Sequence, residues 1–179
     1  MTDSSSSMAT LYSDLSRFEK HSSTKVDEGE RHDRLNDLHD TFRQQVDRHQ
    51  GQVVRRVGHS FVVQFPTAEA AVRCGLDLQN IYSRQNWLVK PGLRVEPRIT
   101  VQFAPVVRKP GQTAQEVVRR AAALESFTPD SSVCVPQAVL EKIRGKVRAK
   151  VTDLGPHRLP KVLEPVLLYA LVPARSVFQ

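Results

Sequence analysis

A compact pattern of apolar and polar positions lies in residues 53–65, VVRRVGHSFVVQF. Two strand-forming runs, Val53–Val54 and Phe61–Val63, flank a short link that contains Gly58 and His59. Such runs on either side of a glycine-containing link are typical of a β-hairpin. Because helical patterns precede and follow this hairpin, we expect it to form the centre of a sheet and to carry His59 at its tip.

Helix-type spacing occurs on both sides of the hairpin. Apolar residues three and four positions apart predict a helix over residues 35–49 that ends at Gly51. Thr67 is a favourable N-cap for a second helix over residues 67–82. The polar residues 21–33 are expected to form a loop or the frayed start of the first helix.

The remaining apolar runs extend this alternation of strands and helices. Further strands are expected over residues 9–13, 93–107 with an interruption at Pro97, 133–135, 151–154 and 164–172. Further helices are expected over residues 113–124, where Thr113 and Glu116 have capping-box spacing, and over residues 136–144. This order predicts an α+β fold with a βαββαβ core and additional strands and helices.

The 179 residues are expected to form a single domain over residues 9–174, between a disordered leader at residues 1–8 and a tail at residues 175–179. No run approaches the roughly 20 apolar residues of a membrane span, and the polar start lacks the apolar segment of a secretory signal. Cys74 and Cys134 have no metal-ligand spacing and are expected to be buried free thiols. A cytoplasmic location fits these features.

The chain is basic, with a formal net charge of +7 and a pI near 9.8. This charge favours anionic partners such as nucleotides, nucleic acids or acidic proteins. Aromatic residues make up only 6%, and the sequence has no RNA-binding aromatic motif or Cys/His finger, so nucleic acid is not the expected partner. Basic residues at every second position of residues 142–150 predict a solvated strand face; a surface for an acidic partner or nucleic acid is the alternative.

Asp14 directly follows the strand predicted for residues 9–13. A carboxylate at a strand end, followed by a turn whose N–H groups point outward, can hold a metal ion and a phosphate. The alternative is that Asp14 only forms the turn or caps the segment that follows.

Four segments in order carry a family resemblance: ATLYSDLSRF at 9–18, GQVVRRVGHSFVVQF at 51–65, PTAEAAVRCGLDLQ at 66–79 and VTDLGPHRLPKVLEPVLLYAL at 151–171. Together they resemble the catalytic domain of the class III nucleotidyl cyclases, the adenylate and guanylate cyclase homology domain. The resemblance extends over residues 10–172. It implies a ferredoxin-like βαββαβ core with additions, which agrees with the order of elements predicted from the residue patterns.

In this family two Asp carboxylates hold two divalent ions, which assist attack of a ribose 3′-hydroxyl on the α-phosphate with release of pyrophosphate. The resemblance places Asp14 at the first metal position and His59 at the second. A neutral imidazole is a poor magnesium ligand and cannot supply anionic bridging oxygens. No cofactor is therefore expected, apart from magnesium or manganese if any activity remains.

Other site positions depart from the family as well. The phosphate-holding turn corresponds to four residues, Leu15, Ser16, Arg17 and Phe18. Arg17 stands where the family has a glycine that allows close backbone approach. The family's Asn and its transition-state Arg correspond to Arg119 and Ala123, and alanine offers no charge-assisted hydrogen bond. The positions for a purine-reading Lys/Asp pair hold Val53 and the loop Arg108–Lys109.

These departures predict a catalytically degenerate cyclase homology domain that acts as a dimerising or regulatory signalling module, paired with itself or with a related cyclase domain. One alternative is a divergent adenylate or guanylate cyclase that uses Asp14 and His59 with manganese, which tolerates imidazole better than magnesium does. The other is a nucleotide-sensing domain without turnover, with Arg17 and Arg119 as phosphate contacts. The ordinary roles for these residues are a strand-end cap for Asp14, a hairpin tip for His59 and surface charge for the arginines.

Overall fold

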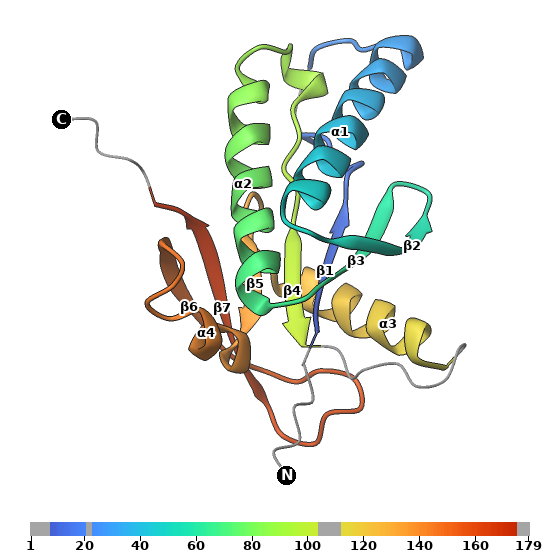
Figure 1. Cartoon of the computed structure of the whole chain (residues 1–179). Coiled ribbons are helices and arrows are strands. Elements are labelled where there is room, and N and C mark those ends of the chain that lie inside the picture. Colours follow the sequence, from blue (N-terminus) through green and yellow to red (C-terminus); the bar gives the residue numbers. More distant parts are fainter. Residues whose placement is uncertain (1–7, 21–22, 104–111, 175–179) are drawn as a thin grey trace, which may run out of the picture.

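The computed structural model describes residues 8–20, 23–103 and 112–174 (Figure 1). Within these ranges the strands are β1 (Ala9–Asp14), β2 (Gln52–Val57), β3 (Ser60–Phe65), β4 (Ile99–Phe103), β5 (Val133–Pro136), β6 (Ala149–His157) and β7 (Val166–Pro173). The helices are α1 (Glu28–Arg48), α2 (Ala68–Asn86), α3 (Gln112–Phe127) and α4 (Gln137–Ile143), with a 3₁₀ turn at Pro91–Leu93. The predicted tail, and all of the predicted leader except Met8, lie outside the described residues.

The strands form one sheet in the order β2-β3-β1-β4-β5-β7-β6. β4 and β5 pair in parallel, and the other neighbours pair antiparallel. Because β1 lies between β3 and β4, the first four strands with α1 and α2 make a ferredoxin-like βαββαβ core. The predicted α+β fold with this core is confirmed.

The expected central position of the hairpin is wrong. β3 pairs with both β1 and β2, but β2 is an edge strand and all its residues are exposed. A β-branched run predicts a strand without indicating how many neighbours that strand has. The two residues between the strands are Gly58 and His59, and Gly58 has a φ of +59°, which favours glycine at this turn.

Helices cover both faces of the sheet (Figure 1). α1, α2 and α4 enclose the main core, to which they contribute Leu38, Phe42, Leu78 and Val139. α3 lies on the opposite face, where Ala121 packs against Tyr12 and Val62. Since side chains alternate along a strand, Leu11 of β1 enters the main core while Tyr12 faces α3.

Two predicted boundaries differ most from the structure. α1 begins at Glu28, inside the stretch expected to be a loop or a frayed helix start. The Asp27 side chain accepts the N–H of Glu30, and the Glu30 side chain accepts the N–H of Asp27, which makes a capping box. The strand expected over residues 93–107 begins only at Ile99, after Pro97, whose missing N–H cannot join a ladder of hydrogen bonds.

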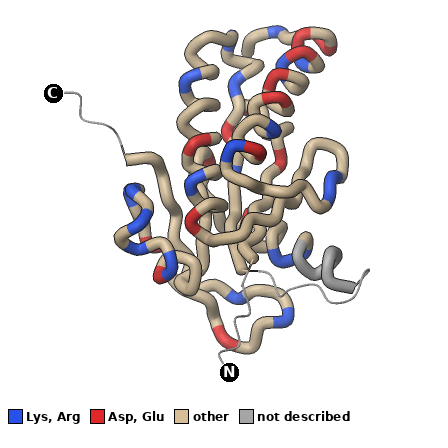
Figure 2. Tube along the Cα trace, in the orientation of Figure 1, with Lys and Arg blue, Asp and Glu red and all other residues tan. Residues whose placement is uncertain are grey.

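Several general expectations can be compared with the structure. Cys74 and Cys134 are buried free thiols, as predicted. No helix in the described part of the chain is long and apolar enough to cross a membrane. Charge is unevenly distributed: Figure 2 shows acidic positions along α1 and basic positions around α4 and the start of β6.

Candidate functional site

The end of β1 and the turn after it form the centre of the candidate site. Asp14 pairs with Ser60 in the register of β1 and β3, so the strand end lies beside the hairpin tip. The N–H of Leu15 donates to the carbonyl of His59 at 2.9 Å. The structure therefore brings the backbones of the two predicted metal positions, Asp14 and His59, close together.

One carboxylate oxygen of Asp14 is bound by the turn itself. Its Oδ1 accepts the backbone N–H of Ser16 at 2.8 Å and the Ser16 hydroxyl at 2.7 Å. This geometry is that of an Asx-turn, in which the Asp side chain accepts the backbone N–H two residues later. It corresponds to the turn-forming role considered for Asp14. Both donors occupy Oδ1, so a cation at the same oxygen would have to compete with them.

The guanidinium of Arg17 lies in a network of ion pairs. Its Nη1 is 3.7 Å from Oε1 of Glu125, and its Nη2 is 3.2 Å from Oδ1 of Asp130. Arg98 donates from Nε to the same oxygen of Asp130 at 2.8 Å. Burial raises the pKa of Asp130, but the two arginines outweigh it and lower the pKa overall. The positive charge of Arg17 is thus already compensated by two carboxylates.

The backbone of the same turn is held from its other side by the segment before β4. Phe18 forms an isolated antiparallel bridge with Val95. The carbonyl of Arg17 accepts the N–H of Glu96 at 2.9 Å. The predicted phosphate turn is therefore fixed both at the hairpin and at the segment that precedes β4.

A half-buried acidic cluster lies between β1 and α3. Burial raises the pKa of Glu125, and the negative charge of Asp14 adds to that rise while Arg17 opposes it. Burial also raises the pKa of Tyr12, whose hydroxyl hydrogen-bonds to Oγ of Ser60 at 3.4 Å. Glu125 and Asp14 contribute to the Tyr12 shift through their negative charge. This face of the site therefore disfavours additional negative charge.

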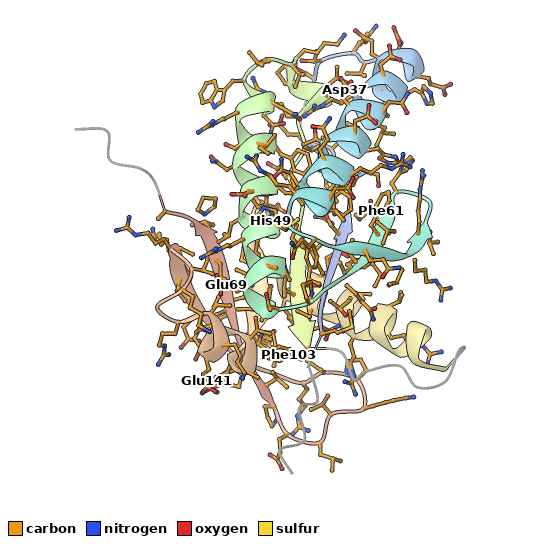
Figure 3. The ribbon with its side chains drawn as sticks, in the orientation of Figure 1. Asp37, His49, Phe61, Glu69, Phe103 and Glu141 are labelled. Carbon is orange, nitrogen blue, oxygen red and sulfur yellow. The ribbon has the colours of Figure 1, made fainter. Side chains whose placement is uncertain are left out.

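The imidazole of His59 contacts α1. Its Nδ1 lies 3.1 Å from Nε2 of His39, and the two ring centroids are 5.2 Å apart. His39 also packs edge-on against Phe61, which Figure 3 labels beside α1. Arg56 places Nη2 3.5 Å from Nδ1 of His39. Burial, followed by the charge of Arg56, lowers the pKa of His39.

The side chains of Asp14 and His59 therefore belong to different faces of the sheet. Asp14 lies two residues after Tyr12 on β1, so it shares the face that α3 covers. His59 contacts His39 of α1, which covers the other face. The strand end and the hairpin tip meet through their backbones, while their functional groups diverge.

These donors do not fit a centre with two magnesium or manganese ions. Such a centre needs oxygen ligands shared between the ions. Asp14 offers one carboxylate with an oxygen already hydrogen-bonded, and the nearby acid Glu125, whose pKa is raised by burial and by the charge of Asp14, is paired with Arg17. Among the side chains that the structure describes, no three His, Cys, Asp or Glu residues are arranged to hold a metal.

The remaining predicted positions lie on α3 and beyond. Arg119 is exposed and Ala123 is half-buried on this helix. Ala123 contributes no polar side-chain group. Val53 lies on the edge strand β2 and is 40% exposed. The loop Arg108–Lys109 lies outside the described residues.

Sequence patterns alone miss four residues around these positions, Tyr12, His39, Arg98 and Asp130. Asp130 is 113 residues from its partner Arg17, and no local pattern connects the two. His39 offered a signal, because it lies three residues before Phe42 and thus near the inward face of a predicted helix. That spacing predicts contact with the neighbouring strand pair, although not with His59 itself.

No family model matches the chain. One curated relative, "Putative adenylate cyclase 3" of Rhizobium meliloti, is 24% identical over 125 residues, which are 70% of this chain and 21% of that protein. The chain thus spans about a fifth of the length of this relative.

Solved structures match over nearly the whole chain. The adenylate/guanylate cyclase/hydrolase from Silicibacter pomeroyi has a TM-score of 0.75 at 24% identity, with 94% of this chain and 97% of that chain covered. The adenylyl cyclase CyaB from P. aeruginosa has a TM-score of 0.70 at 20% identity, with 94% of each chain covered. The resemblance inferred from the sequence is confirmed at the level of the fold: this chain has the fold of the adenylate/guanylate cyclase catalytic domain.

Proposed function

We propose that this chain is a cyclase homology domain without nucleotidyl cyclase activity, which serves as a dimerising and regulatory module in signalling. The observation that carries the proposal is the imidazole of His59, which pairs with His39 of α1 on the face opposite to Asp14. Two-ion chemistry needs an anionic ligand at this position, which together with the first carboxylate binds the two ions. Neither the chemistry nor the direction of this side chain meets that requirement.

The ion pairs of Arg17 support the same conclusion. A triphosphate that approached the turn after β1 would meet the carboxylates of Glu125 and Asp130 beside the guanidinium. Its negative charge would have to displace both acids before Arg17 could bind it, and like charges repel at these distances. This argues against Arg17 as a phosphate contact, and hence against a nucleotide-sensing role.

The side chain of Ala123 supplies a third argument. Ala123 stands at the position that the resemblance assigns to the arginine whose guanidinium stabilises the transition state. Loss of one such donor typically lowers the rate by about 100- to 1,000-fold. Combined with the missing second carboxylate, this loss removes two of the groups with which the family stabilises the developing charge.

The regulatory part of the proposal rests on pairing. The resemblance to the class III cyclases implies that the domain pairs, and we propose that this chain forms a homodimer or a heterodimer with a related cyclase domain. The edge strand β2 exposes apolar side chains, with Val53 40%, Val54 46% and Val57 59% exposed. Exposed apolar residues that gather on an edge strand are a common feature of interaction surfaces.

Turnover is tested by incubating the purified protein with ATP or GTP and either magnesium or manganese, and by measuring cyclic nucleotide by mass spectrometry. The matched control is Asp14→Ala, and an active cyclase of the same fold serves as the positive control. We expect the same background from the wild type and from Asp14→Ala. Cyclic product that disappears in Asp14→Ala would overturn the proposal in favour of a manganese-dependent cyclase.

Pairing and nucleotide binding are measured separately. Sedimentation at micromolar concentration should give about twice the 20.2 kDa monomer mass, and a monomer would remove the dimerising role. Calorimetric titration with ATP and GTP should show no heat of binding. Binding that weakens in Arg17→Ala would instead support a nucleotide-sensing domain.

A further inference from the structure

Two imidazole nitrogens face each other between the hairpin tip and α1. Nε2 of His39 and Nδ1 of His59 are 3.1 Å apart, with the ring planes inclined at 60°. Both side chains are half-buried. The pair is therefore held in place by the fold and is still reached by solvent.

The separation of these nitrogens suits joint coordination of one metal ion. Zinc–nitrogen bonds of about 2.0–2.1 Å place two ligand nitrogens about 2.9 Å apart at a right angle and about 3.3 Å apart at the tetrahedral angle. The observed 3.1 Å lies between these limits. In a hydrogen bond at this distance one of the facing nitrogens donates its N–H and the other accepts, so the lone pair of the acceptor already points into the gap.

The packing around His39 limits the movement of one ligand. Its ring lies edge-on to Phe61 at 5.3 Å between centroids, and Phe61 in turn packs against Phe42 of α1 at 4.8 Å between centroids, with the rings tilted by 38°. His59 is fixed through its backbone, since its carbonyl accepts the N–H of Leu15. Ligands held in this way lose little conformational freedom when a metal binds.

We propose that His39 and His59 form a two-histidine binding site for a divalent transition-metal ion of the zinc, nickel or copper type. Imidazole suits these ions, whereas magnesium and manganese favour oxygen donors. The remaining coordination positions are left to water or to a ligand from outside this chain. The site lies on the α1 face of the sheet and does not include Asp14, so it differs from the two-ion centre that the family resemblance implies.

Arg56 provides a specific test of this assignment. Its Nη2 lies 3.5 Å from Nδ1 of His39, the nitrogen that would not bind the metal. A metal-bound histidine normally donates that second N–H to an acceptor, and Arg56 offers only donors. The guanidinium is also held by the carbonyl of Gly58 at 3.0 Å and over the Phe61 ring at 5.3 Å. Removing it should therefore strengthen metal binding.

The experiment is calorimetric titration of the untagged full chain at neutral pH with zinc, nickel and copper salts. We expect one ion per chain, and a loss of affinity of at least about tenfold in His39→Ala and in His59→Ala, because even changes around a ligand cost about 10- to 100-fold. Arg56→Ala should bind more tightly than the wild type. The matched control is His49→Ala, whose imidazole pairs with Asp77 instead.

Two outcomes would overturn the proposal. One is the absence of saturable binding to the wild type. The other is binding that His39→Ala and His59→Ala leave unchanged, which would assign the metal to other residues. Circular dichroism of each variant separates loss of a ligand from loss of the fold. None of these readouts depends on cyclase activity. The metal site can therefore be disproved while the proposed function stands, and the proposed function can be disproved while the metal site stands.

Discussion

Oδ1 of Asp14 accepts two hydrogen bonds from Ser16, one from the backbone N–H at 2.8 Å and one from the hydroxyl at 2.7 Å. The carboxylate at the first metal position of the cyclase fold is thus part of the turn that ends β1. The next residue, Leu15, joins this turn to the hairpin through the carbonyl of His59. In this chain the strand end serves to connect β1, the hairpin and the following loop.

Ser16→Ala should lower the free energy of unfolding by about 1.5–3 kcal/mol, the usual contribution of a hydrogen bond to a charged group. The remaining backbone N–H bond keeps the turn closed, so the fold should persist. Urea unfolding should show a lower midpoint with an unchanged slope. Ser83→Ala, on the exposed face of α2, is the control and should show no loss; equal stability of Ser16→Ala and wild type would contradict the structural role of this pair.

Glu125→Gln should change the pH dependence of stability. Burial raises the pKa of Glu125 in the folded state above its ordinary value of 4.5. The folded protein therefore binds this proton more tightly than the unfolded chain, so stability from this group is present below pH 4.5 and is lost as pH rises through the folded-state pKa. Glutamine does not titrate, so the stability of the variant relative to wild type should improve from pH 4 to pH 7. A difference that is constant across this range, or that worsens, would refute the shift.

Gly51→Ala should lower the free energy of unfolding by about 1–3 kcal/mol, the usual cost of overpacking a core. An added Cβ would lie 2.6 Å from Cε1 of Phe65 and 3.0 Å from Cγ1 of Val46, both of them fully or almost fully buried. Gly29→Ala on α1 is the control, since its Cβ would meet only Asp27 Oδ1, at 3.2 Å. Thermal or urea unfolding compares the two variants, and a Gly51→Ala protein as stable as wild type would show that α1 and the hairpin are not packed this closely.

Cys74 and Cys134 should be unreactive in the folded protein. Burial raises the pKa of Cys74 to about 12 and that of Cys134 to about 11, so almost no thiolate is present at pH 8. A disulfide reagent such as Ellman's should modify both thiols quickly in urea and only slowly without it. Rapid modification of either thiol in the native protein would contradict its burial.

The elements were predictable from sequence because their signals are local. Thr67 caps α2, and the predicted hairpin appears at the predicted turn. The position of that hairpin was not predictable in the same way, because an edge strand and a central strand can share one residue pattern. The early start of α1 did have a local signal in Asp27 and Glu30, whose capping box lies within an otherwise polar stretch.

The candidate site was predictable in position but not in geometry. The family resemblance places Asp14 and His59 at adjacent points, and the backbone contact between Leu15 and His59 agrees with this. The direction of the His59 side chain depends on His39, 20 residues earlier, on a helix that packs against the hairpin. The partner of Arg17 at Asp130 depends on the complete sheet. Side-chain pairs that form only in the assembled fold leave no trace in a local pattern.

The carboxylate of Asp14 should not hold a pair of catalytic cations at the end of β1. The most direct measurement is anomalous diffraction from crystals soaked with manganese and a nonhydrolysable nucleotide analogue. No pair of manganese peaks should appear at the carboxylate of Asp14. Two peaks that share an oxygen of this carboxylate would contradict it.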